Sequence, residues 1–490
     1  MVTATGLGSG LDINALVTGI VDAERVPLME RLDSRKSDVD GLVTGFDSLS
    51  GSLSSIRDAI ANLVDSNKLN ATATESTQSS VVSATASATA QTGTYEVNVS
   101  QLAETQSLIS GNFTATSDVV GSGTLAIAIG TPTYNSSPND GTYASFTQTS
   151  TVNVTIPANA TLAGVRDAIN SSSAGVNASI LFDGSNYRLM LSGNSTGAAQ
   201  AIAITVSGDS AGSDTDASGL SQLAFDANTA NLTQVREAKN AALTINGVSL
   251  TSTSNTVTNV VDGLSLTLQG TTSSSATVSI AHDSAAVIDS INSFVTAYNT
   301  HNGSQKSLTK YDVTTGAAGV LQGDAMTRTI LTQLRNMITT EIAGLTGSIA
   351  NLTDLGITVQ SDGSLKVDEA TLETAVTTNF ASVEKFFLGE TVSGVVVTGF
   401  GTQLDALLDG FLDPDGLITE KLTSLDSKLE DIEADRTLYT RRMEALEERY
   451  YRQFNAMDTL LGQLTTTGEM LKNQLDALPG YQNLRQSGNR

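Results

Sequence analysis

The chain has 490 residues and a formal net charge of −25, from 26 basic and 51 acidic side chains. Such an acidic chain is a poor partner for nucleic acid or anionic membrane surfaces, because binding to either depends on basic side chains. It contains no cysteine, which excludes disulfides and thiolate metal sites, and its length predicts about three or more domains.

The first predicted element is a long helix near the N-terminus. A 4-3 spacing of apolar residues runs from Leu28 to Leu63 with Arg35 as its polar interruption, and this spacing is typical of a coiled coil. A weaker apolar stripe precedes it, and we expect Pro27 to limit the helix before it. The predicted seam residues are Leu28, Leu32, Val39, Leu42, Phe46, Leu49, Leu53 and Ile56, and the stripe before them contains Leu7, Leu11, Leu16, Val17 and Ile20.

Residues 69–281 read as β-rich. Polar and apolar residues alternate in stretches such as 94–99 and 151–156, and Asn246-Gly247 predicts a hairpin turn. Thr161 is the expected cap of a short helix over 162–169. The tract 131–142 reads as a surface excursion, and 208–219 as a flexible loop or linker. We expect two β-rich head domains, residues 71–130 with 236–283, and residues 131–235 inserted between them.

Helical periodicity returns at residue 284. Candidate helices cover 284–298, 324–342 and 369–387, with a hairpin predicted over 357–367. A second 4-3 seam then runs from Ile418 to Leu471. Its predicted seam residues are Leu422, Leu425, Leu429, Ile432, Tyr439, Met443, Leu446, Tyr450 and Met457, and the last apolar residues are Leu471, Leu475 and Leu478.

These elements predict an α+β multidomain protein. Neither seam is stable alone in water, so the two chain ends are expected to pack together, or against other subunits, as a coiled-coil stalk. Leg segments are expected at residues 1–40 and 445–490, and a helical stalk domain with a small hairpin at 41–70 and 284–444. Whether the terminal stripes fold back on their own domain or become ordered only on assembly stays open.

The sequence offers little catalytic chemistry. His282 and His301 are the two imidazoles, and no serine lies in a nucleophile motif. The aspartates at 209, 214 and 216 do not have calcium-loop spacing, and the glycines at 6, 8 and 10 follow no predicted strand. No apolar stretch reaches the length of a membrane span. We therefore predict a protein that is not an enzyme and has no catalytic residues, metal or cofactor.

Several motifs, in chain order, resemble one known family. Residues 6–13 with 24–28 look like the N-terminus of the bacterial flagellar filament cap proteins, a family of hook-associated proteins. Further similar segments cover both ends and the core of the chain: 95–99, 101–103, 245–247, 254–256, 319–324, 355–357, 362–365 and 452–458.

The resemblance implies a secreted structural protein at the distal tip of the flagellar filament, exported by the flagellar type III apparatus. It implies a homo-oligomeric ring that retains exported flagellin and promotes its folding and insertion. The implied partners are other copies of the chain, flagellin, hook–filament junction proteins and a cytoplasmic export chaperone on the C-terminal helix. Nucleic-acid binding and membrane insertion are not expected.

Two other interpretations stay open. The charge-poor region 69–281, rich in threonine, serine and asparagine, is compatible with a surface adhesin that binds host glycans. Helical ends around β-rich insertions are also compatible with another axial component, such as a hook–filament junction protein or flagellin.

Overall fold

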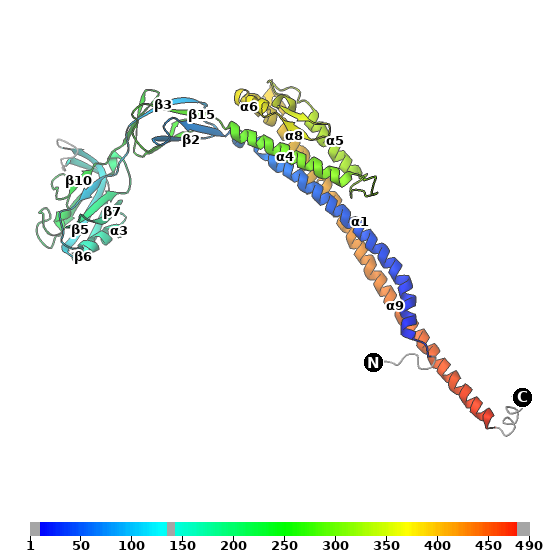
Figure 1. Cartoon of the computed structure of the whole chain (residues 1–490). Coiled ribbons are helices and arrows are strands. Elements are labelled where there is room, and N and C mark those ends of the chain that lie inside the picture. The colour runs from blue at the N-terminus through cyan, green and yellow to red at the C-terminus, as the bar shows by residue number, and fades with distance from the viewer. Residues whose placement is uncertain (1–9, 135–142, 478–490) are drawn as a thin grey trace. The chain divides into compact units, whose positions relative to one another are not determined.

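A computed structural model describes residues 10–134 and 143–477. The chain forms two compact units, one made of Met1–Asp65 with Ala286–Arg490 and the other of Ser66–Ala285. Long helices from both chain ends dominate the first unit, and β-sheets dominate the second (Figure 1). The predicted α+β fold with helical ends and a β-rich middle is therefore confirmed.

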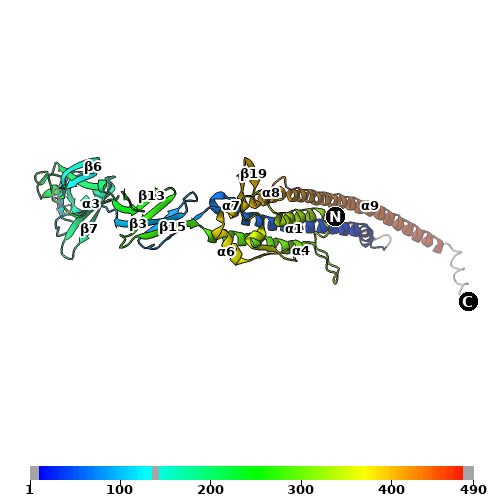
Figure 2. The same ribbon diagram turned by 90° about the horizontal axis from the view of Figure 1, so that it is seen from above.

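The helical unit is built on two long helices, α1 (Ile13–Val64) and α9 (Leu417–Asp476), which lie side by side in both views (Figures 1 and 2). The shorter helices are α4 (Ser284–Thr309), α5 (Ala325–Thr339), α6 (Glu369–Thr378), α7 (Phe380–Leu388) and α8 (Phe400–Leu412). Two small hairpins complete the unit, β16 (Ile357–Val359) with β17 (Leu365–Val367), and β18 (Gly389–Val392) with β19 (Val395–Thr398).

These elements test the predicted pattern in the helical region. The candidate helix at 284–298 is confirmed as part of α4, and the one at 324–342 is confirmed as α5, which is slightly shorter than predicted. The hairpin over 357–367 is confirmed as β16 and β17. The stretch 369–387 divides into α6 and α7 at Asn379, whose φ of −124° and ψ of 33° leave helical geometry.

Pro27 does not end the first helix, contrary to the sequence prediction. It lies inside α1, which runs without a break from Ile13 to Val64. Proline removes one backbone hydrogen bond and bends a helix, but packing on both sides can offset that cost. Val21 and Leu32 flank Pro27, and each is 2% exposed.

An aromatic cluster ties the shorter helices together. Phe386 of α7 stacks on Phe400 of α8, with ring centroids 5.2 Å apart and planes 6° apart, and Phe294 of α4 meets Phe400 edge-on at 5.9 Å. A Cβ at Gly401 would lie 2.9 Å from the Phe387 carbonyl oxygen. Glycine at this position therefore allows α8 to approach the end of α7 closely.

The β-rich unit begins with the short helix α2 (Ser66–Leu69) and contains two separate cores. The first core lies between a sheet of order β1-β15-β3-β11-β12 and a sheet of order β13-β14-β2. Its strands are β1 (Thr72–Ser76), β2 (Val82–Ala86), β3 (Gly93–Gln101), β11 (Ala241–Ile245), β12 (Val248–Ser252), β13 (Thr256–Val261), β14 (Leu264–Leu268) and β15 (Ala276–His282). The predicted Asn246-Gly247 hairpin is confirmed between β11 and β12, with both residues at positive φ.

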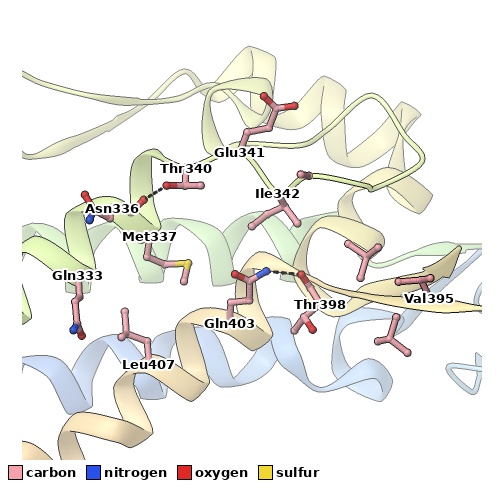
Figure 3. A pocket seen from close by; sticks show the side chains of 13 residues that line it. Gln333, Asn336, Met337, Thr340, Glu341, Ile342, Val395, Thr398, Gln403 and Leu407 are labelled. Carbon is pink, nitrogen blue, oxygen red and sulfur yellow. Dashed lines mark hydrogen bonds between the residues drawn. The ribbon is translucent and has the colours of Figure 1, made fainter.

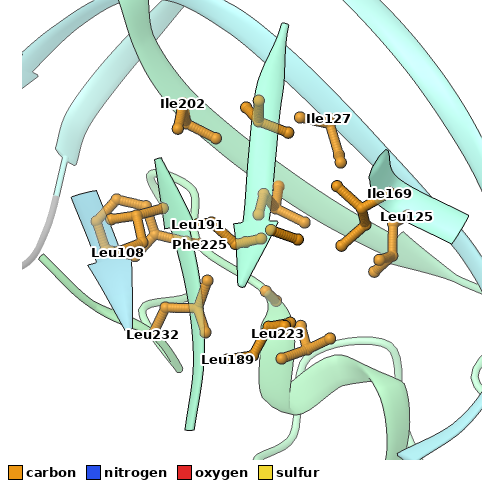
Figure 4. Packing of buried hydrophobic residues seen from close by; sticks show 14 of the residues in the cluster. Leu108, Leu125, Ile127, Ile169, Leu189, Leu191, Ile202, Leu223, Phe225 and Leu232 are labelled. Carbon is orange, nitrogen blue, oxygen red and sulfur yellow. The ribbon is translucent and has the colours of Figure 1, made fainter. Parts of the chain in front are cut away.

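The second core, shown in Figure 4, lies between sheets of order β10-β4-β8-β7 and β6-β5-β9, with the short helix α3 packed against it. Its elements are β4 (Ser107–Ile109), β5 (Val119–Tyr134), β6 (Tyr143–Thr161), α3 (Leu162–Ser171), β7 (Val176–Phe182), β8 (Tyr187–Gly193), β9 (Ala201–Ser207) and β10 (Thr233–Arg236). The predicted cap is confirmed, since the Thr161 hydroxyl accepts a hydrogen bond from the Gly164 backbone N–H.

The predicted border between the two β-rich domains, at residues 130 and 131, needs correction. It falls inside β5, which pairs with β6 along its length. The chain passes between the cores at Glu104 and Lys239, which exchange backbone hydrogen bonds of 2.9 and 3.1 Å. Strands on both sides of this crossing share one composition, so the sequence carries no signal of it.

Two loop predictions also change. Residues 131–134 of the expected excursion belong to β5, and residues 135–142 lie outside the described part. The segment 208–219 is a loop, as one of the two predicted alternatives has it, and not a linker, because Asp209 accepts hydrogen bonds of 2.7 Å from both the backbone and the hydroxyl of Ser221. These bonds fold the segment onto the second core next to Leu220, which is fully buried.

A buried polar network in the second core generates a stability prediction. The fully buried Gln106 donates hydrogen bonds of 2.6 Å to the Tyr143 hydroxyl and to Oε1 of Gln234, and its own Oε1 accepts from the Ile202 backbone N–H. Gln106→Ala removes these bonds and leaves buried partners unsatisfied, so we expect a loss of about 3 kcal/mol. Urea unfolding measures it. The matched Gln148→Ala variant, at an exposed position, should change stability by less than about 0.5 kcal/mol.

A buried histidine in the helical unit generates a pH prediction. His301 is 1% exposed, its Nδ1 lies 2.9 Å from the Ser52 hydroxyl, and burial lowers its pKa from 6.5 to about 4. Between these values the unfolded chain binds a proton that the folded chain excludes, so stability falls as pH falls through this window. The loss should reach about 3 kcal/mol near pH 4, measured by urea unfolding. His301→Gln should flatten this part of the profile, and an unchanged slope would contradict the assignment.

Candidate functional site

The two terminal helices form an antiparallel pair. Along α1 the contacts with α9 run in reverse order, from Val17 beside Met443, through Asp33 at 3.3 Å from Arg436, to Phe46 at 5.4 Å from the Lys421 amine. The Arg436–Asp33 ion pair accounts for one polar residue in the α9 seam, because an arginine at the edge of the stripe keeps its guanidinium in water.

The predicted seam residues occupy three levels of burial. The buried ones are Leu32, Phe46, Leu49, Leu53 and Ile56 of α1 and Leu425, Ile432 and Met443 of α9. The half-buried ones are Leu28, Val39, Leu42, Leu422, Leu429, Tyr439, Leu446 and Tyr450. Met457 is the exception, at 41% exposed. The seam is thus closed from the aromatic cluster outward and opens toward the C-terminal end of α9.

The closed part of the pair ends in a small apolar cluster. Asp12 caps α1 by accepting a hydrogen bond of 3.0 Å from the Ala15 N–H. The first turns of the helix then bury one face against α9. The cluster consists of Ile13, Val17, Val21 and Met443, with Leu446, Tyr450, Tyr451 and Phe454 packed around it.

The other face of these first turns is open. Leu16 and Ile20 are 41% and 38% exposed, and Leu11, just before the helix, is 49% exposed. Of the predicted leg residues on α1, the structure therefore brings Val17 alone into the packed cluster, and Leu7 lies outside the described residues. Ile13, Tyr451 and Phe454 are cluster members that the prediction missed. The spacing of four between Ile13, Val17 and Val21 is a signal for Ile13.

The end of α9 carries a long uncovered apolar stretch. Between residues 455 and 477, no described side chain is buried, although the apolar 4-3 spacing continues. We call this stretch the terminal apolar face; it consists of Met457, Leu460, Leu464, Leu471 and Leu475, which are 40–63% exposed. From Met457 to Leu475 the helix rises roughly 28 Å. Leu478, predicted to belong here, lies outside the described residues.

The two histidines, which are the imidazoles that the sequence offers for catalysis, do not lie in one site. His301 packs inside the helical unit, whereas His282 ends β15. Across residues 10–134 and 143–477 there is no group of three or more acidic, histidine or cysteine side chains placed to hold a metal ion. Nor does any helix within these ranges combine the length and apolar content that a bilayer span requires.

Comparison with known proteins identifies the family. The model of the flagellar hook-associated protein 2 C-terminus matches residues 238–466, and that of its N-terminus matches residues 9–106. The A-type flagellar hook-associated protein 2 of Pseudomonas aeruginosa is 30% identical over 98% of both chains. The chain belongs to the flagellar hook-associated protein 2 family. The Escherichia coli K12 member is 29% identical over 97% of this chain and 98% of its own.

The fold agrees with this family assignment. The crystal structure of the D1-D2-D3 domains of the Escherichia coli flagellar cap protein superposes with a TM-score of 0.60 at 28% identity, covering 78% of this chain and 99% of that one. The predicted filament-cap family, capping role and place on the flagellum are thereby confirmed. A flagellin hook IN motif also matches residues 141–195, a segment of the second β-core.

The two faces of the first turns of α1 generate a prediction for this family member. Val17 is fully buried in the cluster, whereas Ile20 is 38% exposed. Val17→Ala should weaken the start of the helix pair by about 2 kcal/mol and raise amide hydrogen exchange over residues 13–21 about 30-fold. Ile20→Ala is the matched control and should leave exchange unchanged. Equal exchange in both variants would show that α9 does not hold this segment.

Proposed function

We propose that copies of this chain form a homo-oligomeric ring at the distal end of the flagellar filament. The ring retains exported flagellin and promotes its folding and insertion beneath the cap. Family membership supports this role, and the terminal apolar face of α9 supplies the observation that carries the mechanism. In this proposal, residues 1–40 and 445–490 act as legs, and residues 41–70 with 284–444 act as the stalk that holds them.

The legs work by many weak contacts. A stripe of five apolar residues on one helix is a modest interface, and part of its binding free energy is lost because docking restricts the movement of the side chains and of the helix end. Several such legs on one ring bind with a high effective local concentration, so the cap stays attached while single contacts exchange. Exchange of this kind lets a new subunit enter without releasing the cap.

The same face accounts for the proposed partners. An exposed apolar stretch roughly 28 Å long invites aggregation before export, and a cytoplasmic chaperone on the C-terminal helix would cover it. After export, hook–filament junction proteins would receive the legs first and flagellin would receive them later. The function needs binding and release, so we propose no catalysis and no cofactor. Neither the relatives nor the matched structure favours the adhesin alternative, and host glycans are not part of the proposal.

Substitution on the terminal apolar face tests the function. Leu464 and Leu471 are 63% and 53% exposed, so Leu464→Asp with Leu471→Asp should leave the folded chain and its melting temperature unchanged. Charges in this stripe should prevent the legs from docking, because an unpaired carboxylate is costly to bury. Electron microscopy of cells carrying only this variant should show filaments that are short or absent, with flagellin in the medium.

The control uses the same substitution on the same helix. Leu438 is 62% exposed and lies outside the 4-3 stripe, so Leu438→Asp should support filaments of normal length. Normal filaments in the double variant would refute the leg mechanism. Defects of equal size in the double variant and the control would mean that any added charge on α9 impairs assembly.

A further inference from the structure

The helical unit contains a groove that the legs do not use. It lies between the C-terminal half of α5, the start of α8 and β19, and encloses about 710 Å³ (Figure 3). Met337, Ile342 and Leu407 supply apolar side chains to its walls. Gln403 fixes one end of β19, donating a hydrogen bond of 2.7 Å to the Thr398 carbonyl oxygen.

One wall of the groove is the unpaired edge of a strand. All four residues of β19, Val395 to Thr398, line the groove, although successive side chains of a strand point to opposite faces. A wall to which every residue contributes is therefore the backbone edge of the strand. Within the part of the chain that the structure describes, β18 is the only strand that pairs with β19.

The turn fixes which backbone groups face outward. Ser393 and Gly394, at φ of 50° and 82°, form a two-residue turn, so Val392 and Val395 next to it form a hydrogen-bonded pair. Pairs alternate along an antiparallel hairpin, which directs the N–H and C=O of Val396 away from β18. These are the groups that an added strand would bind.

The edge is short, at four residues, but otherwise lacks the usual protection against strand addition. Besides keeping edge strands short, natural sheets guard free edges with charged residues, prolines or bulges, because an apolar edge pairs with other chains. Here the edge reads Val-Val-Val-Thr, and the side chains of Val395 and Val396 are 64% and 74% exposed. A short apolar edge without charge or proline, beside an apolar groove, is expected where the addition of a short strand is useful.

The size and charge of the groove indicate what binds there. A stable interface between folded proteins takes about 800 Å² and 20–30 residues from each partner, which a four-residue edge does not provide. The edge matches an extended segment of about four residues, some 13 Å long. Among the described residues that line the groove, Glu341 is the one charged side chain, so a neutral or basic segment is favoured over an acidic one.

We infer that this groove binds short, extended, apolar segments of unfolded exported flagellin by adding them as a third strand to the β18–β19 hairpin. The identity of the bound protein, flagellin, rests on the proposed capping function. The kind of segment that binds rests on the groove alone. Binding through a few backbone hydrogen bonds is weak and tolerant of sequence. Such a contact delays the escape of an unfolded chain and releases the segment once folding sequesters it.

The chemistry is tested on the purified full-length chain. The probe is a fluorescein-labelled synthetic peptide that alternates valine and threonine and carries a lysine at each end, and binding is followed by fluorescence anisotropy. Val396→Lys should weaken binding about tenfold, because it places a positive charge and a longer side chain at the edge. A peptide N-methylated at alternate positions should also bind more weakly, because it cannot complete the strand. Val313→Lys is the matched control, at an 85% exposed position that does not line the groove, and should bind like the unsubstituted chain.

The outcomes separate this inference from the capping function. Absence of saturable peptide binding, or equal binding by Val396→Lys and the unsubstituted chain, would refute strand addition in the groove, whatever the α9 variants show. Loss of self-association in Val396→Lys by sedimentation velocity would overturn it in favour of a second copy of the chain as occupant. Peptide binding weakened by Val396→Lys with normal filament growth in cells would overturn flagellin as the occupant, while shorter filaments than those of Val313→Lys would support it.

Discussion

The apolar seam between α1 and α9 is the contact on which the helical unit depends. It joins segments some 400 residues apart in the sequence, so closing it requires the whole intervening chain to be accommodated as a loop. Two features make this closure favourable. The 4-3 spacing continues along both helices, and the seam ends at a core of fully buried aromatic rings. Once the seam is closed, the start of α1 and the second half of α9 lie together, which is the precondition for a leg.

The same seam explains why α1 covers only part of the proposed leg segment of α9. α1 supplies partners for α9 as far as Phe454, and beyond that point the apolar spacing of α9 continues with no helix among residues 10–134 and 143–477 packed against it. An apolar stripe that extends beyond its partner helix in the same chain indicates a partner in another chain. In a member of the flagellar hook-associated protein 2 family, the surface that remains open is therefore the one that we propose for assembly.

Much of this architecture is visible in the sequence, because heptad spacing and strand alternation are periodic signals that survive without tertiary information. The failures have local causes. Pro27 reads as a helix end, yet flanking contacts on α9 carry the helix through it. The border between the β-rich cores is hidden because strands on both sides have the same composition.

In the candidate site too, periodicity predicts which residues form a stripe but not which of them are buried. Periodicity places Leu16, Val17 and Ile20 in one stripe, but only the partner helix determines that Val17 is buried and the other two are open. The β18–β19 hairpin escaped prediction altogether, because its Ser393-Gly394 turn is a weaker hairpin signal than the Asp362-Gly363 turn of the predicted hairpin. Its groove depends on α8, which follows β19 directly, and on α5, which lies much earlier in the sequence and is brought to the hairpin only by the tertiary fold.

The position of the glycines divides α9 into a stiff part and a more flexible end. From Leu417 to Phe454 its sequence contains neither glycine nor proline, and contact with α1 stiffens it. Gly462 and Gly468 follow within the uncovered portion, and a glycine inside a helix costs about 1 kcal/mol relative to alanine. The tip can therefore bend or unwind by a turn while the paired portion keeps its geometry. In the proposed leg, a stiff paired part of α9 followed by a flexible end can stay bound while each added subunit changes the surface beneath it.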